Sequence, residues 1–350
     1  MTNKEDIRTK TLAEITAFFE ASGEKAFRAR QAWQWLWQKG ATRFEEMTSL
    51  SRETRALLEA RYAIRAAAVT AAQESRDGTT KLGVTLADGL VVEMVLIPAG
   101  EGKSTACVST QVGCKLRCDF CATGRMGFAR DLEAGEIVDQ VMLARKTLEA
   151  RGAALGNIVL MGMGEPLLNY DRVLAATRLI ASPDALAISP YRLTLSTAGI
   201  PAGIRRLADD GARFHLAVSL HSALDATRER LMPVNKAYPL AALSDALAYF
   251  VEKTGTRPTL EYLLLDGVND GEEDARALAL FCRRFPVKIN VIEYNPVEGS
   301  AYKRTPEERR DRFIRALEER NMVVNLRRGR GRDIDAACGQ LANFANKERP

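Results

Sequence analysis

Three closely spaced cysteines are the residues of this chain with the clearest capacity for chemistry. They lie in the run Cys114-Lys-Leu-Arg-Cys118-Asp-Phe-Cys121, a CxxxCxxC spacing. Thiolates ligate soft metals and iron–sulfur clusters. Three cysteines can hold three irons of a [4Fe–4S] cluster and leave the fourth iron open to a small molecule, whereas a structural zinc site normally takes four ligands. Gly113 and Gly124 flank the run and allow a loop to wrap around a cluster.

Three further cysteines, Cys107, Cys282 and Cys338, lie outside that run. Six cysteines in 350 residues do not indicate a disulfide scaffold. Taken alone, a single cysteine of this kind is usually a small buried apolar residue. We keep that interpretation for Cys282.

Alternating short apolar strands and amphipathic helices, from about residue 104 onward, must position these cysteines. This alternation predicts a parallel α/β barrel or open sheet, in which chemistry takes place at the C-terminal ends of the strands. The expected strands are 106–111, 157–161, 192–196, 214–219, 259–265, 288–292 and 323–326, and the expected helices include 133–150, 171–180, 240–253, 272–285 and 306–320.

Two different segments precede this region. Hydrophobic residues spaced for one helix face predict three helices at 11–21, 26–39 and 51–62. Two β-rich runs, 81–87 and 90–97, are joined by Asp88-Gly89, which is typical of a hairpin. We therefore expect an N-terminal helical domain at 1–65, a hairpin extension at 66–100, a core at 101–340 and a tail at 341–350.

The composition is that of an ordinary globular protein. Hydrophobic residues make up 46% and charged residues 27% of the chain, which argues against a disordered chain. No apolar run reaches the ~18 residues that a membrane span needs, and the N-terminus lacks the apolar region of a signal peptide. We expect a cytoplasmic protein without membrane contact.

The net charge of +5 is mild, but its distribution is uneven. Residues 303–332 contain eleven Lys or Arg against five Asp or Glu, a local net charge of +6. A local basic surface can hold a polyanion, although a solvated amphipathic helix followed by a basic turn gives the same pattern. The stretch ends in Arg327-Arg-Gly-Arg-Gly-Arg332, shortly before Cys338.

The aromatic residue Phe120 completes the pattern CxxxCxΦC, and here the sequence resembles the radical S-adenosylmethionine (SAM) superfamily. The resemblance implies a partial (β/α)6 TIM-like barrel. It also implies one [4Fe–4S] cluster on Cys114, Cys118 and Cys121, with SAM on the fourth iron. Reductive cleavage of SAM then yields a 5′-deoxyadenosyl radical, and the protein orients this chemistry.

Polar residues at later strand ends are similar to the elements with which that superfamily binds SAM. Gly162-Met-Gly164-Glu165 follows the second expected strand, like the superfamily's Gly-Glu element that contacts the SAM amino group. Taken singly, each later polar run is as easily a cap or a turn. The resemblance assigns SAM contacts to Gly164, Glu165, Ser196, Ser219, Leu220, His221 and Asn295.

Longer phrases, spread over nearly the whole chain, resemble the RlmN/Cfr family of RNA methyltransferases. These phrases are VVEMVLIP, CVSTQVGCKLRCDFCATG, VLMGMGEPLLN, LTLSTAGI, AVSLHS and DIDAACGQL. The resemblance implies methylation at C2 of adenosine 2503 in the peptidyl transferase centre of 23S rRNA and of adenosine 37 in tRNAs. The alternative within the family is methylation of C8 of the same rRNA adenosine, and the separate N-terminal helical domain favours C2. A non-enzymatic iron–sulfur RNA-binding protein is the alternative from another class.

The family resemblance also gives roles to residues outside the cluster motif. Carbon C2 of adenine is electrophilic and cannot attack the SAM methyl group directly, so a thiolate takes the methyl first. Cys338 resembles this methyl-carrying cysteine. Cys107 resembles the resolving cysteine, which frees Cys338 by forming a transient disulfide. Glu93 resembles the general base, although by itself it would be an alternating polar residue on a hairpin strand.

The implied partners are 23S rRNA, tRNA and an electron donor such as flavodoxin, and we expect a monomer. Extrusion of the target base costs a few kcal/mol. The arginines of 327–332 are well placed to hold phosphates near Cys338. The N-terminal domain provides a second candidate contact surface with Arg28, Arg30, Lys39 and Arg43.

Overall fold

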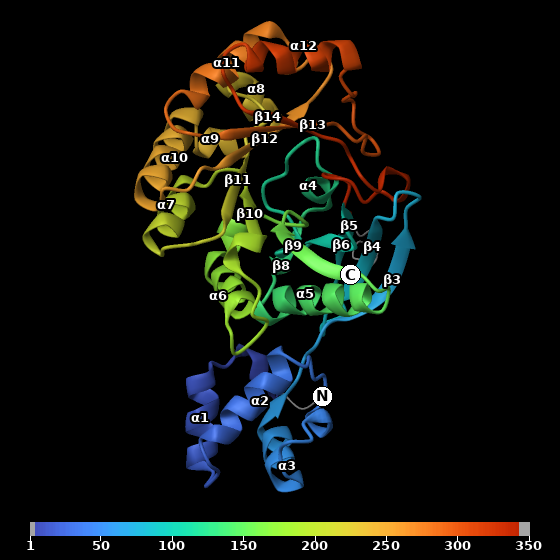
Figure 1. Cartoon of the computed structure of the whole chain (residues 1–350), viewed down its shortest axis with the longest axis vertical. Coiled ribbons are helices and arrows are strands. Elements are labelled where there is room, and N and C mark those ends of the chain that lie inside the picture. Colours follow the sequence, from blue (N-terminus) through green and yellow to red (C-terminus); the bar gives the residue numbers. More distant parts are fainter. Residues whose placement is uncertain (1–3, 343–350) are drawn as a thin grey trace.

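The computed structural model describes residues 4–342 (Figure 1). The chain folds into a small helical body at its N-terminus and a larger body built on one extended sheet. Most of the expected tail, 343–350, lies outside the described residues. No helix among those described is both long and apolar enough to cross a bilayer.

The N-terminal body contains the three expected helices, which are α1 (Leu12–Ala21), α2 (Phe27–Trp37) and α3 (Arg52–Arg61). Thr11 begins α1 with a capping box, in which its side chain and that of Glu14 bond reciprocally to each other's backbone N–H. The short strands β1 (Glu5–Asp6) and β2 (Tyr62–Ala63) pair in parallel and close this body. Its core is apolar and buried, with Ile15, Phe19, Leu36, Trp37 and Leu58 at its centre.

The core body has a ten-stranded sheet among the described residues, in the order β14-β13-β12-β11-β10-β9-β6-β5-β4-β3. Neighbouring strands from β6 to β14 are parallel, and β3 to β6 pair antiparallel. The parallel strands are β6 (Lys103–Cys107), β9 (Ala154–Leu160), β10 (Leu193–Thr197), β11 (His215–Ser219), β12 (Thr259–Leu264), β13 (Lys288–Glu293) and β14 (Val324–Arg327). The expected partial barrel of six parallel strands is present, and β14 adds a seventh at its edge.

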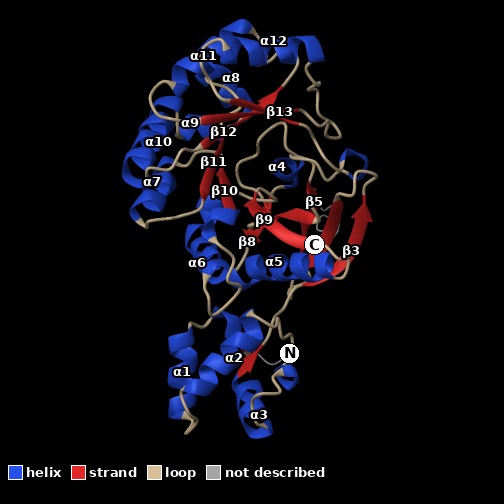
Figure 2. Ribbon diagram, viewed as in Figure 1, coloured by secondary structure: helices blue, strands red, loops and turns tan. Residues whose placement is uncertain are grey.

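Helices cover the outer face of these strands and form a crescent around them (Figures 1 and 2). This is the arrangement that right-handed βαβ connections produce. The longer helices are α5 (Ala134–Glu149), α6 (Tyr170–Ala181), α7 (Pro201–Asp209), α10 (Leu240–Thr254), α11 (Glu272–Cys282) and α12 (Glu307–Glu318). The shorter ones are α4 (Ala122–Met126), α8 (Asp225–Leu231) and α9 (Val234–Ala237).

The hairpin extension is larger than the sequence predicts. The expected pair is present as β4 (Thr80–Thr85) and β5 (Val91–Gly100), but a third strand, β3 (Ala68–Glu74), pairs with β4. The expected strand 106–111 is also wrong at its end, because it is divided between β6 and β7 (Gln111–Gly113), which pairs with β8 (Phe128–Asp131). The break occurs where the N–H groups of Thr110 and Gln111 both donate to the carbonyl of Met163.

A buried ion pair joins the two bodies. Arg8 Nη1 donates to Asp139 Oδ1 of α5 at 2.5 Å, and both side chains are almost fully buried. The other oxygen of Asp139 accepts the N–H of Ala67 at 2.8 Å, in the segment that leads from the N-terminal body to β3. Asp139 thus binds both Arg8 of the helical body and the segment that leads from this body to β3.

Candidate active site

A cavity of about 250 Å³ lies at the C-terminal ends of the parallel strands. All five cysteines that the sequence singles out line it, together with six of the seven residues expected to contact SAM. These residues are Cys107, Cys114, Cys118, Cys121, Cys338, Gly164, Glu165, Ser196, Ser219, His221 and Asn295. The seventh, Leu220, is fully buried beside the cavity, and its backbone N–H donates to the carbonyl of Glu261 at 3.0 Å.

The cysteine loop has its tight path because two of its glycines lie against backbone. Gly113 has a φ of +79°, and a Cβ there would lie 2.0 Å from the carbonyl oxygen of Gly127. A Cβ on Gly124 would lie 2.9 Å from backbone atoms of Cys118. Cys121 is the N-cap residue of α4. A side chain at either glycine would require the backbone of this loop to shift.

The three loop thiols are half-buried and close enough to affect one another's ionisation. Desolvation raises the pKa of Cys114 to about 12, and the neighbouring Cys121 charge adds to this effect. Among the described residues, no three His, Cys, Asp or Glu side chains converge as ligands of one metal ion. In a cluster each thiolate binds a different iron, and the positive charge of the irons offsets the repulsion between the closely spaced thiolates. The donor set therefore fits an iron–sulfur cluster better than a single ion.

Glu165 organises the loops that follow β9 and β10. Its buried carboxylate accepts the N–H groups of Leu167 at 3.0 Å and Ala198 at 2.7 Å, and the hydroxyl of Thr197 at 2.7 Å. The preceding Gly164 has a φ of +102°, and a Cβ there would lie 2.5 Å from Gln111 Cβ. Burial raises the pKa of Glu165, and the three donors oppose that shift.

His221 is a neutral wall of the cavity. Its Nδ1 accepts the N–H of Leu263 at 3.1 Å, which leaves the imidazole proton on Nε2. Burial, helped by the nearby Arg228 cation, lowers its pKa to about 3. The ring packs edge-on against Phe120, with centroids 4.8 Å apart. The aromatic residue of the cysteine motif thus contacts a loop expected to bind SAM.

Asn295, which follows β13, provides the strongest local sign of a ligand site. Both polar atoms of its side-chain amide are buried and have no hydrogen-bond partner in the structure. Gly329 leaves room for this amide, because a Cβ on Gly329 would lie 2.3 Å from Asn295 Oδ1. Since buried polar groups are nearly always paired, a donor–acceptor group of the kind found in SAM fits this part of the cavity.

Cys107 and Cys338 come together here although they are far apart in the sequence. Both line the cavity, and both thiols are free. Cys107, at the end of β6, is buried, and burial raises its pKa to about 12. Cys338 is exposed to the cavity; desolvation raises its pKa, while the Arg327 cation lowers it.

Glu93 does not line the same cavity. It faces a neighbouring hollow of about 670 Å³, where its carboxylate accepts the N–H of Ala342 at 2.9 Å and lies 3.5 Å from Lys81 Nζ. Burial raises its pKa, and Lys81 opposes the shift. Residues 335–342 form the wall between the two spaces. The structure therefore places Glu93 on the far side of the segment that carries Cys338.

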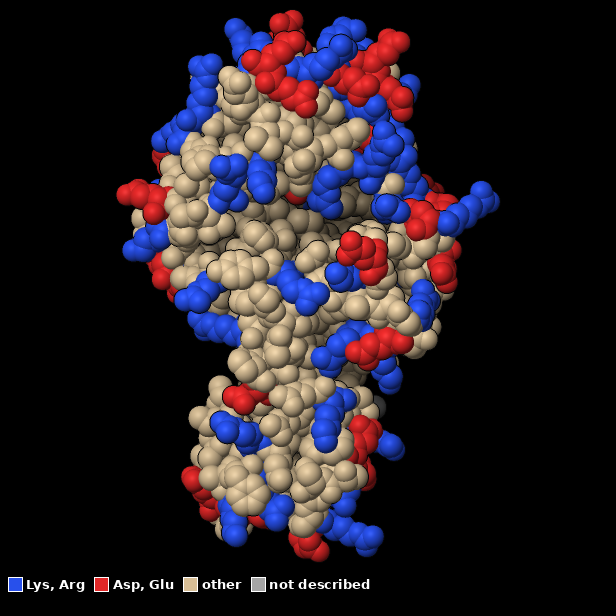
Figure 3. All heavy atoms as spheres, viewed as in Figure 1, with Lys and Arg blue, Asp and Glu red and all other residues tan. Residues whose placement is uncertain are grey.

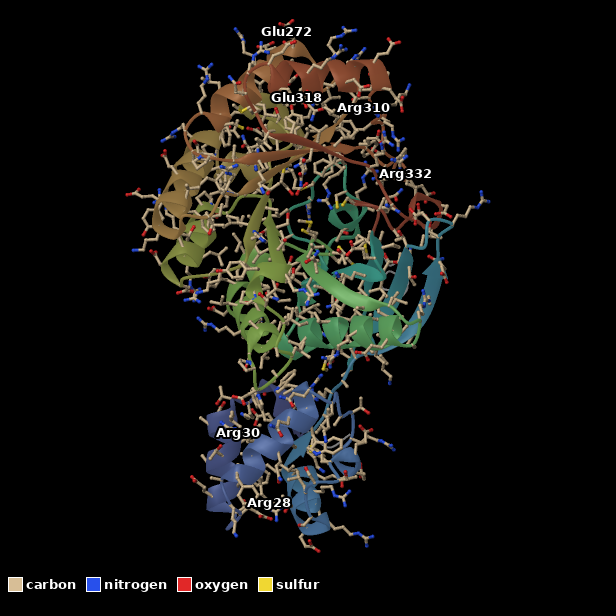
Figure 4. The ribbon with its side chains drawn as sticks, viewed as in Figure 1. Arg28, Arg30, Glu272, Arg310, Glu318 and Arg332 are labelled. Atoms are coloured by element: carbon tan, nitrogen blue, oxygen red, sulfur yellow. The ribbon has the colours of Figure 1, made fainter. Side chains whose placement is uncertain are left out.

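The basic stretch is less free than its charge count implies. Arg327 lies 3.3 Å from the buried carboxylate of Glu261, so this arginine, which is expected to hold phosphate, already has an anionic partner in the structure. Arg310 and Arg332 both pair with Glu293, at 2.6 and 2.7 Å (Figure 4). Lys and Arg side chains border a hollowed region of the visible face (Figure 3). Arg328 and Arg330 are exposed, and neither has an ion pair with the residues described.

The expected cations of the N-terminal body lie along α2 and the following turn. Arg28 pairs with Glu24 at 3.1 Å, and Arg30 lies 4.0 Å from Asp184 of the core body (Figure 4). Lys39 Nζ lies 3.7 Å from the ring centroid of Trp35. Exposed pairs of this kind are weak, so they leave these cations available to a polyanion.

Comparison with known protein families and relatives assigns the chain to a family. Residues 6–64 match the Ribosomal RNA large subunit methyltransferase N-terminal domain, and residues 108–279 match the Radical SAM superfamily. A protein of Flavobacterium johnsoniae named probable dual-specificity RNA methyltransferase RlmN is 49% identical over 97% of both chains. A dual-specificity RNA methyltransferase RlmN of Nitratidesulfovibrio vulgaris is 47% identical over 96% of this chain and 94% of its own. The chain belongs to the RlmN family of radical SAM RNA methyltransferases.

A solved structure supports the same assignment. The crystal structure of a radical SAM methyltransferase from Sphaerobacter thermophilus has a TM-score of 0.91 and 38% identity, and the match covers 96% of this chain and 99% of that one. Membership of the RlmN family implies a [4Fe–4S] cluster and SAM. The cavity described above is where this chain has thiols and unpaired polar atoms for them.

Sequence reasoning missed one pair within the RlmN-type cavity. Glu261 of β12 and Arg327 of β14 both line it, and Asn290 of β13 donates to Glu261 at 2.9 Å. Register explains the contact, because Glu261 lies opposite Asn290 and Ile292 lies opposite Arg327 on neighbouring strands. The available signal was the carboxylate in the apolar strand Thr-Leu-Glu-Tyr-Leu-Leu.

Proposed function

We propose that this enzyme methylates C2 of adenosine 2503 in 23S rRNA and of adenosine 37 in tRNAs, through a methylated cysteine and two molecules of SAM. The observation that carries the proposal is the meeting of Cys107 and Cys338 in the same cavity as the three loop cysteines. A simple iron–sulfur RNA-binding protein would need neither of these two thiols. We also expect a monomer that acts in the cytoplasm and takes electrons from a flavodoxin-type donor.

The cofactor sites follow from the cavity. Cys114, Cys118 and Cys121 would hold the cluster, and Gly164, Glu165, Ser196, Ser219, His221 and Asn295 would surround SAM. When bound, the cluster and SAM supply the methyl group and a 5′-deoxyadenosyl radical. All further steps use side chains of this chain.

Cys338 would act as the methyl carrier. Its thiolate would attack the methyl carbon of the first SAM, so that an S–CH₃ bond forms, the sulfonium S–C bond breaks and S-adenosylhomocysteine leaves. This S-methyl group would then lose one hydrogen atom to the 5′-deoxyadenosyl radical that a second SAM would supply, with 5′-deoxyadenosine as the product. The resulting carbon radical adds to C2, and the one-carbon unit then links Cys338 to the adenine.

Glu93 and Cys107 would complete the reaction. Glu93 takes the C2 proton, and its raised pKa makes it a stronger base than an ordinary carboxylate. Cys107 then attacks the sulfur of Cys338; the S–C bond breaks, a disulfide forms and methylated RNA leaves. The methylene carbon keeps the electron pair of the broken S–C bond and takes up a proton, so it becomes the new methyl group. The single electron left over after radical addition and loss of the C2 proton would pass back to the oxidised cluster, and the external reductant would later supply the two electrons that reduce the disulfide.

Membership of the family sets the reaction class, while the carbon that is methylated needs a direct test. Reconstituted enzyme, SAM and a one-electron reductant are incubated with unmodified rRNA and tRNA, and the digested nucleosides are analysed by mass spectrometry. We expect 2-methyladenosine and 5′-deoxyadenosine. Only 8-methyladenosine would establish the Cfr-like alternative, and a Cys338→Ala protein that still methylates would falsify the carrier role.

A further inference from the structure

The segment that carries Cys338 has little structure of its own. Between Gly331 and Ala342 the chain has three residues with positive φ, which are Gly331 (+63°), Asp335 (+51°) and Gly339 (+84°). The short 3-10 turn Arg332–Ile334 is the regular element within it. Contacts with other parts of the fold must therefore determine where the Cys338 thiol lies.

The turn between β3 and β4 grips this segment from one side. The Ser75 hydroxyl donates to Asp333 Oδ1 at 2.5 Å, and the N–H of Arg76 donates to Asp333 Oδ2 at 3.2 Å. In the opposite direction, the N–H of Gly331 donates to Asp77 Oδ2 at 2.9 Å. We call the side chains of Ser75, Asp77 and Asp333 the clasp. Its partners are more than 250 residues apart in the sequence.

Both carboxylates of the clasp have lowered pKa values, so both stay ionised as hydrogen-bond acceptors. Desolvation opposes ionisation of Asp77, but hydrogen bonds from Thr79 and Gly331 lower its pKa to about 2. The bonds from Ser75 and Arg76 also lower the pKa of Asp333. Charged acceptors make shorter and stronger hydrogen bonds than neutral ones. The β3–β4 hairpin that presents Ser75 and Asp77 is part of the central sheet, so it gives the segment with Asp333 a fixed partner.

The cysteine loop holds the other side of the segment. The N–H of Ala122 donates to the carbonyl of Gly339 at 2.7 Å, and the Thr123 hydroxyl donates to that of Leu341 at 2.5 Å. Cys338 therefore lies between a clasp on the hairpin and an anchor on the first turn of α4. In this position it faces the cavity with Cys107.

We propose that Asp77 and Asp333 are positioning residues for Cys338, because the clasp holds the preceding chain so that the thiol faces the cluster loop and Cys107. This inference rests on the proposed role of Cys338 as the methyl carrier. It concerns where the thiol is held, which can be measured without methylation.

The test uses the full chain, cluster-free and reconstituted, with Asp77→Asn and Asp333→Asn combined. The first readout is the rate at which iodoacetamide alkylates Cys338, measured by peptide mass spectrometry. The second is the fraction of Cys107–Cys338 disulfide in a glutathione buffer. There, oxidised glutathione is the oxidant and is converted to two reduced glutathiones. Neutralising the acceptors of these three charge-assisted hydrogen bonds should raise the alkylation rate about tenfold and lower the disulfide equilibrium constant about tenfold.

Asp88→Asn is the matched control, because Asp88 lies in the neighbouring β4–β5 turn and accepts a backbone N–H, but contacts Arg130 instead of the Cys338 segment. It should leave both readouts unchanged. A folded double variant with wild-type values for both would overturn the proposal. If that variant does not fold, Ser75→Ala provides the test, because it removes one donor to Asp333. We expect it to change both readouts about threefold. No change in either readout would again overturn the proposal. Loss of methylation with Cys338 geometry intact would count against the proposed function alone.

Discussion

The carboxylate of Glu93 accepts the backbone N–H of Ala342, a residue 249 positions later in the chain, at 2.9 Å. Both residues face the outer hollow, while Cys338, four residues before Ala342, faces the cysteine cavity. The proposed base and the proposed methyl carrier thus lie on opposite sides of one segment. An adenine joined to Cys338 would therefore have to reach Glu93 around this segment, or the segment would have to move.

The free and the paired arginines of the basic stretch should behave differently. Arg328→Gln combined with Arg330→Gln should weaken RNA binding and reduce the slope of log affinity against log salt by about 1 for each phosphate that is no longer neutralised. Arg327→Gln should instead lower the free energy of unfolding by about 2 kcal/mol, because it leaves the buried Glu261 carboxylate without its cation and with only the hydrogen bond from Asn290. Filter binding at several salt concentrations measures the effect on RNA binding, and urea unfolding measures the effect on stability. An unchanged salt slope in the double variant would rule out phosphate binding by Arg328 and Arg330.

Asn295→Ala should have opposite effects on stability and on SAM binding. Its amide is buried and unpaired, so removing it should leave the free energy of unfolding unchanged or raise it by about 1 kcal/mol. The affinity for SAM should fall about tenfold. Asn235→Ala is the control, because Asn235 is buried but bonded to Arg228 and Asp225, and should lose stability. Normal SAM affinity in Asn295→Ala, measured by equilibrium dialysis, would contradict the assigned contact.

The thiols should show a fixed order of reactivity. Cys338 is exposed and should be alkylated first, while Cys107 and Cys282 are buried with pKa values raised to about 12. Since only the thiolate reacts, the rate at Cys107 should rise about tenfold per pH unit from pH 7 to about 11. Cys282 lies outside the cavity and provides the reference for simple burial. A rate at Cys107 that levels off below pH 9 would show that its thiolate is stabilised.

The ion pair between the two bodies should be the main electrostatic link of the fold. Arg8→Gln leaves the buried Asp139 carboxylate without its cation, which should cost about 3 kcal/mol of unfolding free energy. We also expect faster proteolysis between residues 63 and 68. Arg30→Gln removes an exposed contact at 4.0 Å to Asp184 and should change the stability by less than ~0.5 kcal/mol. Equal losses of stability in the two variants would mean that Arg8 contributes through packing alone.

Local patterns in the sequence were enough to predict much of the core. The parallel strands are short apolar runs between amphipathic helices, and the cysteine spacing is itself a local motif, so neither depends on distant contacts. β3 was missed because its residues, Ala-Val-Thr-Ala-Ala-Gln-Glu, are all exposed and show no alternation of polar and apolar side chains. An edge strand of this kind is specified by its neighbour rather than by its own pattern.

The site was predictable where a resemblance carried it and not where folding alone decides the contact. The eleven cavity residues came from motifs, but the partner of Arg327 lies 66 positions earlier on a strand two places away in the sheet. For the same reason, charge counting predicts a phosphate contact for Arg327 but not its ion pair with Glu261, which depends on the register of β12 to β14. The wall that separates Glu93 from Cys338 is likewise a tertiary feature.

The bond between Ala122 and Gly339 limits how far the reacting sulfur can travel. Gly339 is the very next residue after Cys338, and adjacent Cα atoms are about 3.8 Å apart. Even if the clasp opens, Cys338 can move only a short distance as long as the carbonyl of the next residue, Gly339, stays bound to α4. The methyl-carrying sulfur therefore has a small range of movement, so the target nucleotide must cover most of the distance to it.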